Sequence, residues 1–291
     1  MRILLILALL IALASFVSAT PWEKSADANL TLTQNSYSDN WVGGESGALC
    51  WTFNFNGLAQ KQLSTKVNNK NTLKLSFGQT HSQNQITKNW AKPVKSTDLV
   101  DFETVFRFTL GAFVDPFASG RLETQFLDQS DTLKTRSFNP MTLTESAGAS
   151  KVFIHKDKQD LSTRLGFGLR QHINRDVLDP IANTRSTETT NDGGIMSVTD
   201  FTTPLAKDKI TFTSKLSLFK ALYYSEADLL EGLPNENYWK AVDINWENIF
   251  AASITKYVMV NLYVQLLYDK EIDLAGRFKQ TLALGLTYKL I

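Results

Sequence analysis

Cysteine and histidine are scarce in this chain of 291 residues. Cys50 is the only cysteine, so no intramolecular disulfide can form, and a small disulfide-stapled secreted domain is excluded. Cys50 also lies well past the predicted processing site, too far for a lipoprotein anchor, and we interpret it as a packed or lipid-facing thiol. The three histidines, His81, His155 and His172, are scattered, whereas a metal site needs several ligands that converge. We therefore expect no metal and no cofactor.

The sequence also lacks a charge excess and long apolar segments. Its formal net charge is +1, whereas a nucleic-acid binder needs a basic excess, so we expect no nucleic-acid partner. A single apolar run follows Arg2 and ends before Val17-Ser18-Ala19, an arrangement typical of a signal peptide cleaved after Ala19. No later run approaches the length that a membrane-spanning helix requires. We predict a signal peptide over 1–19 and one domain over 20–291.

What the chain has in abundance is apolar/polar alternation with a period of two. Phe102, Phe106 and Phe108 share one predicted strand face, and Asp101 and Glu103 share the other. The pattern recurs after residue 26 and predicts twelve strands, over 26–36, 48–60, 71–81, 100–112, 119–129, 141–155, 161–173, 193–203, 209–223, 239–250, 254–268 and 275–291.

The lengths of these strands and of their connections favour a membrane barrel over a sandwich. Most predicted strands have about 10–15 residues, whereas soluble strands average about 5–6 and a tilted membrane-spanning strand needs about 9–11. From the third predicted connection to the tenth, long loops alternate with tight turns. An up-and-down barrel produces that alternation, and a Greek-key sandwich does not. The sequence therefore predicts an all-β fold, an up-and-down antiparallel transmembrane β-barrel of about 12 strands, located in the outer membrane.

The C-terminus supports the same architecture. Apolar residues occupy every second position from Leu282 to Leu290, so the final strand is predicted to pair with the first and remove both sheet edges. The terminal residue is Ile291 rather than an aromatic, with Tyr288 as the nearest ring. We expect such a strand to engage the outer-membrane assembly machinery of Gram-negative bacteria, and we expect membrane lipid and lipopolysaccharide around the barrel.

Three short motifs carry a family resemblance. They are Asn40-Trp-Val-Gly-Gly44, Phe138-Asn-Pro-Met-Thr-Leu-Thr-Glu-Ser-Ala-Gly148 and Leu284-Gly-Leu-Thr-Tyr-Lys289. The chain resembles a family of outer-membrane proteins catalogued only as a domain of unknown function, in which an Asn-Trp-x-Gly-Gly motif opens the domain and a Gly-Leu-x-Tyr-Lys strand ends it. The resemblance covers most of the processed chain. It implies a β-barrel and carries over no catalytic or binding residue.

The polar strand faces hold the candidate site. In a barrel these faces line the lumen. The predicted lumen acids are Asp101, Glu103, Glu123, Asp243 and Glu247, and the bases are Lys74, Arg107, Arg121, Arg164, Arg170, Lys215, Arg277 and Lys279. Because unpaired buried charges cost several kcal/mol each, they are expected to pair across the lumen. A salt-bridged interior and a slightly basic channel for a small, unidentified solute both fit this pattern.

We predict an outer-membrane barrel without catalytic residues, either a narrow, porin-like pore or transport protein or a structural one. One alternative is a lipid-modifying barrel enzyme. It would need an activated nucleophile beside a base, yet no histidine has a serine two residues later on the same strand face. His81 and His172, at predicted strand ends, are the available bases. Another alternative is a soluble secreted β-protein that acts as an adhesin or binding module.

Overall fold

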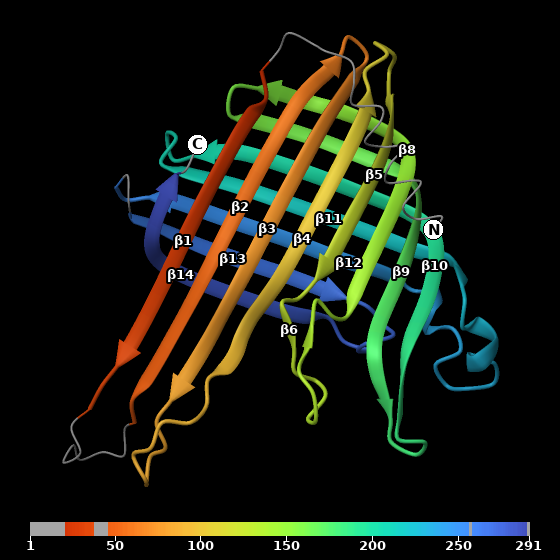
Figure 1. Cartoon of the computed structure of the whole chain (residues 1–291). Coiled ribbons are helices and arrows are strands. Elements are labelled where there is room, and N and C mark those ends of the chain that lie inside the picture. Colours follow the sequence, from red (N-terminus) through yellow and green to blue (C-terminus); the bar gives the residue numbers. More distant parts are fainter. Residues whose placement is uncertain (1–20, 38–45, 256–257, 290–291) are drawn as a thin grey trace.

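Twelve long strands close one antiparallel barrel in the computed structural model, which describes residues 21–37, 46–255 and 258–289 (Figure 1). The strands are β1 (Glu23–Asn35), β2 (Ala48–Ser64), β3 (Val67–Ser82), β4 (Val94–Phe108), β5 (Asp115–Thr124), β8 (Met141–Lys156), β9 (Gln159–Asp179), β10 (Thr184–Leu205), β11 (Ile210–Tyr224), β12 (Val242–Ser253), β13 (Val258–Tyr268) and β14 (Arg277–Lys289). Between β5 and β8, the short strands β6 (Leu127–Asp128) and β7 (Arg136–Ser137) form a separate two-stranded sheet. Two 3₁₀ turns, η2 (Ala227–Leu230) and η3 (Tyr238–Lys240), lie between β11 and β12.

Every barrel strand pairs with its neighbour in the chain, and β1 pairs with β14 to close the ring. The predicted fold class, strand number and up-and-down topology are therefore confirmed. Because direction reverses at each strand, alternate connections lie at the same end. The connections that follow β3, β5, β9, β11 and β13 lie at one end, which we call the long-loop end, and those that follow β2, β4, β8 and β10 lie at the other.

Two predicted connections are wrong, because the chain there is still strand. The expected long loop over 174–192 is a paired continuation of β9 and β10, and only 180–183 forms the tip. The expected loop over 61–70 shrinks to the turn at 65–66. Both segments carry polar residues on both faces, so the apolar stripe that identifies a strand is missing there. The register also contains irregularities, at Ser186/Glu188 and Gln62/Ser64.

The distribution of buried and exposed side chains is the reverse of that in a soluble protein. Among the described residues, the buried apolar side chains are Phe117, Val198, Phe219 and Ala221, and the buried polar ones are more numerous. On β9, Arg164 is 7% exposed, while its neighbour Leu165 is 56% exposed. The wall is thus apolar outside and polar inside, which is the pattern that lipid imposes on a closed barrel. A soluble sandwich would bury these apolar faces, so that alternative is wrong, and the chain is an outer-membrane β-barrel surrounded by lipid.

No helix among the described residues is long and apolar enough to cross a membrane. The predicted signal peptide over 1–19, the Asn40–Gly44 motif and Ile291 lie outside the described residues.

Candidate functional site

Ion pairs cross the lumen between strands that are not neighbours. Lys74 Nζ on β3 lies 3.0 Å from Glu247 Oε2 on β12. These strands stand nearly opposite each other in the ring, so the two side chains must extend through the interior to meet. Lys215 on β11 likewise donates to Glu103 on β4 at 2.7 Å. The two pairs tie opposite walls of the barrel together.

Further pairs complete this charged layer. Arg164 on β9 lies 2.8 Å from Glu103, which therefore pairs with two cations. Arg121 on β5 donates to both carboxylate oxygens of Asp101, at 2.8 and 3.0 Å. Its guanidinium also lies 3.0 Å from Glu123. We call Lys74, Asp101, Glu103, Arg121, Glu123, Arg164, Lys215 and Glu247 the charge layer. Opposite charges within it are in contact, which offsets part of the cost of removing them from water.

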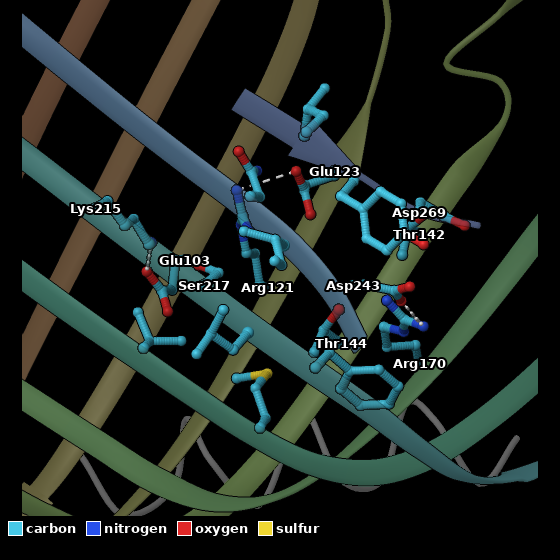
Figure 2. A pocket seen from close by; sticks show the side chains of 18 of the residues that line it. Glu103, Arg121, Glu123, Thr142, Thr144, Arg170, Lys215, Ser217, Asp243 and Asp269 are labelled. Atoms are coloured by element: carbon cyan, nitrogen blue, oxygen red, sulfur yellow. Dashed lines mark hydrogen bonds and ion pairs between the residues drawn. The ribbon is translucent and has the colours of Figure 1, made fainter. Parts of the chain in front are cut away.

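A cavity of about 280 Å³ lies in the lumen beside the charge layer. Glu103, Arg121, Glu123 and Lys215 form its charged boundary, and it extends to Asp269 in a connection of the long-loop end. Figure 2 shows these groups with Thr142, Thr144 and Ser217 around the same space. Sites for drug-sized ligands occupy about 300–1,000 Å³, so this cavity suits a small solute or water.

Arg170 on β9 organises the outer part of the cavity. Its guanidinium donates to Asp192 Oδ1 at 2.8 Å and to Asp243 Oδ2 at 2.8 Å, and it lies 3.7 Å from the ring centroid of Phe219. His172 accompanies it: one ring nitrogen lies 3.1 Å from Thr142 Oγ1, and the other lies 3.4 Å from Asp192 Oδ2. At the rim, desolvation and the nearby carboxylates of Asp269 and Asp243 raise the pKa of Glu271 to about 7.

A rigid hairpin stands at the long-loop rim beside this mouth. The side chain of Asn139 is 1% exposed; it donates to Asp128 at 2.9 Å and accepts from the backbone N–H of Arg175 at 2.7 Å. Arg136 lies 2.6 Å from Asp128. These contacts hold β6 and β7 against the extension of β9. Residues 125–140 do not line the cavity, so this stretch does not plug it.

The remaining predicted lumen cations, Arg107, Arg277 and Lys279, lie outside the charge layer. Arg107 lies 3.9 Å from Asp115 near a tight turn, outside the charge layer. Arg277 lines the cavity, and its buried Nε has no hydrogen-bond partner. Lys279 lies over the ring of Tyr263 at 5.9 Å. Asp101, Glu103, Asp243 and Glu247 were expected to pair with Arg164, Arg170, Arg277 and Lys279. Glu103 contacts Arg164 and Asp243 contacts Arg170, whereas Asp101 contacts Arg121 and Glu247 contacts Lys74.

Sequence reasoning missed two acids of the lumen, Asp192 and Asp200. Asp200 lies 3.6 Å from Arg164. Asp192, placed in a loop by the sequence pattern, pairs in register with Arg170. Both lie an even number of residues from Val198, which is buried in the lumen, so they share its strand face. Extending β10 toward the N-terminus with the same alternation would have placed Asp192 on the lumen face.

Comparisons with known proteins assign no activity to the chain. No curated protein matches the chain. The chain is similar to the COG4313 outer membrane channel from Pseudomonas putida F1 (12% identity, 94% of this chain and 97% of that one, TM-score 0.43). It is also similar to the translocator domain of autotransporter NalP from Neisseria meningitidis (9%, 97% and 92%, 0.37) and to Pseudomonas putida OprB (10%, 92% and 93%, 0.29). Residues 32–129 match the model of a family described as a protein of unknown function (DUF3078). The predicted resemblance to a family of unknown function is thus confirmed, over a shorter part of the chain than expected.

Proposed function

We propose that this outer-membrane barrel is a narrow transport-related protein for small solutes, closed in this conformation by the charge layer. The observation that supports the proposal is the lumen cavity, which extends from the long-loop end and is bounded by Glu103, Arg121 and Lys215. Twelve strands enclose a lumen wider than that of a filled eight-stranded barrel and narrower than that of a sixteen-stranded porin. Whether a solute can pass through the lumen therefore depends on whether the ion pairs of the charge layer separate.

Planar-bilayer recordings test this function. Wild-type protein is expected to show a small, intermittent conductance, and Lys74→Ala/Glu247→Ala a larger one, because this change removes a cross-lumen pair without altering the net charge. The control is Lys158→Ala/Asp208→Ala, which removes a pair of the same charges at 2.6 Å on the exposed turns. Conductance absent from the wild type and from the lumen variant would reject the pore and leave a purely structural barrel.

Ion selectivity reports on the walls of the path. Arg170→Gln leaves Asp192 and Asp243 without their cation, and Arg164→Gln removes one of the two cations on Glu103. The combined variant is expected to shift selectivity toward cations. Arg175→Gln is the control, because Arg175 bonds the carbonyls of Ser137 and Phe138 at the rim. Unchanged selectivity with a less stable barrel would assign these arginines a structural role.

A lipid-modifying hydrolase is the second candidate, supported by the Thr142–His172–Asp192 contacts. A hydroxyl beside an imidazole that also faces a carboxylate is the arrangement of an activated nucleophile. His81, the other proposed base, contacts the ring of Trp90 and does not line the cavity. Fatty-acid release from phospholipid micelles by wild-type protein, lost in Thr142→Val and in His172→Ala, would support hydrolysis. Absence of release by the wild type would reject it.

The route to the membrane is part of the same proposal. A signal peptide over 1–19 directs export, and the outer-membrane assembly machinery inserts the barrel, with lipopolysaccharide as the outer-leaflet neighbour. Outward-facing Phe278, Leu282 and Leu284 on β14 supply the apolar stripe of the final strand. Accumulation of unfolded chain after depletion of the assembly machinery, detected by heat-modifiable gel migration, tests this route. Normal folding after depletion would reject it.

A further inference from the structure

The ring of strands has one incomplete seam, between β1 and β14. Their pairing runs only from Asp27↔Lys289 to Thr31↔Gly285 among the described residues. By contrast, β1 pairs with β2 along its whole length, and β14 pairs with β13 from Arg277 onward. Toward the long-loop end, β1 (red) and β14 (dark blue) diverge in Figure 1. Residues 32–35 of β1 and 281–284 of β14, all of which the structure describes, therefore do not pair with each other.

Inner-face side chains are exposed beside this split. Thr33 on β1 and Thr281 on β14 alternate with outward leucines, so they belong to the lumen face, and yet both are exposed. The outward Leu282 and Leu284 are 70% and 64% exposed, in the range of other lipid-facing side chains such as Leu286 at 65%. Together with the missing strand pairing beyond Thr31↔Gly285 among the described residues, this exposure is consistent with an opening between the lumen and the outside of the wall.

Two lumen cations next to the split have no acid within 4 Å among the described residues. Arg277 lines the cavity with a buried Nε that has no hydrogen-bond partner, and Lys279 Nζ lies over the Tyr263 ring, 5.9 Å from its centroid. The other cations that line the cavity, Arg121, Arg170 and Lys215, each contact a carboxylate. Because a buried cation without a partner is costly, the arrangement at Arg277, with Lys279 two residues further on the same face, suits an anion that arrives from outside the chain.

The surroundings of these cations supply an apolar surface as well. Phe278, Leu282 and Leu284 on β14 and Leu30 and Leu32 on β1 are exposed on the lipid-facing side of the seam. The site is therefore cationic inside and apolar outside, with an unpaired edge between the two. A hydrophilic solute needs only the mouth of the lumen. An acyl chain attached to a charged group needs a path on which its chain stays in contact with lipid.

We propose that the split between β1 and β14 is a lateral opening for a single-chain amphipathic anion, an acyl chain with a carboxylate or phosphate headgroup. The headgroup binds Arg277 and Lys279, and the chain lies through the split along Leu282 and Leu284 into the outer leaflet. This inference rests on the proposed transport function and names its class of solute. Unpaired backbone groups are costly in lipid, so in this proposal water at the membrane surface hydrogen-bonds to these edges, and the acyl chain contacts the apolar side chains.

A disulfide lock tests the opening. In a Cys50→Ala background, Thr33→Cys/Ala283→Cys places thiols at positions that face each other when the Thr31↔Gly285 register is continued. The control pair is Asn54→Cys/Ser76→Cys, in a fully paired wall where the two native side chains are 2.7 Å apart. The probes are fluorescent NBD-labelled dodecanoate and dodecyl phosphate, with NBD-labelled dodecanol as the uncharged comparison. Binding is followed by anisotropy with the protein held in amphipol, and folding by heat-modifiable migration.

Wild-type protein is expected to bind at least one of the two anions at least tenfold more tightly than the alcohol, and comparison of the two separates carboxylate from phosphate preference. Oxidation of the seam pair should weaken binding at least tenfold, with recovery on reduction, and oxidation of the control pair should change nothing. Arg277→Gln/Lys279→Gln should lose the preference for anions while retaining a folded barrel. Equal binding of the alcohol, or binding that is indifferent to the lock, would overturn the inference.

Bilayer recordings on the same proteins distinguish the two proposals. Conductance with lock-independent binding would reject the lateral opening and keep the pore. Lock-dependent anion binding without conductance in any variant would reject the aqueous pore and keep the seam as the binding site.

Discussion

Replacing Glu103 by glutamine tests whether the charge layer stabilises the barrel. Its carboxylate is 9% exposed and contacts Lys215 at 2.7 Å and Arg164 at 2.8 Å, from strands β11 and β9. The amide keeps the shape and removes the charge, so two buried cations lose their shared partner. Breaking a buried ion pair by removing one member costs about 3–5 kcal/mol. We expect a loss in the free energy of unfolding at the upper end of that range, because one carboxylate serves two cations.

The measurement is equilibrium unfolding by urea in detergent micelles, followed by tryptophan fluorescence and by heat-modifiable gel migration. Asp208→Asn is the matched control: it makes the same acid-to-amide change in an exposed pair with Lys158, in which the side chains are 63% and 54% exposed. Exposed pairs contribute about 0–1 kcal/mol. Adding Lys215→Met to Glu103→Gln removes one stranded cation and should restore part of the lost stability.

Equal stability of Glu103→Gln and Asp208→Asn would refute this reasoning, since it would mean that water already solvates the charge layer. A double variant that loses the full sum of both single changes would show that Lys215 and Glu103 are not energetically coupled.

Three further outcomes follow from close contacts. Gly166→Ala should reduce folding yield, because the new Cβ would overlap the Ala147 carbonyl oxygen. Gly120→Ala, with its nearest neighbour at 3.9 Å, should fold normally on the same gel assay. Asn139→Ala should speed tryptic cleavage in the 125–140 hairpin without unfolding the barrel; an unchanged cleavage rate would contradict the role of its buried hydrogen bonds. Acidification through a pKa of about 7 should neutralise Glu271, which faces Asp269, Asp243, Asp192 and Arg170. Cation selectivity in bilayers should therefore fall between pH 8 and pH 6, and Glu271→Gln should abolish that step.

The sequence predicts the parts of this fold where lipid acts on one strand face. Phe102 and Leu165 had to alternate with Glu103 and Arg164, because a one-residue slip would place charges in the bilayer. The twelve strands, their order and the sorting of inner from outer side chains follow from that constraint. The aliphatic stripe of β14 also predicted its pairing with β1, which the structure shows over five residues of β1.

Outside the membrane no lipid requires one strand face to be apolar, and there the prediction from sequence was wrong. Beyond Ile173 and before Gly193 the strands β9 and β10 continue, but both faces carry polar residues, so the sequence pattern resembled that of a loop. The β6–β7 hairpin was missed for a similar reason: Asp128, Arg136 and Asn139 recognise one another and the Arg175 backbone through hydrogen bonds, and such pairings leave no periodicity in the sequence. Pairing partners within the lumen were also not predictable. The apolar/polar alternation tells which strand face a residue occupies, but it does not tell how far along the barrel axis the residue lies.

Shared partners distinguish this lumen from a sealed core. Glu103 contacts two cations, Arg170 contacts two acids, and Arg121 contacts Asp101 and Glu123. Each of these groups can therefore release one partner while keeping the other, so the lumen can rearrange without leaving any of the three wholly unpaired. Filling the interior with apolar side chains of equal volume would often be neutral or more stabilising. A barrel that served only as a structural element would gain from such a core, so these shared ion pairs support the proposed transport of small solutes.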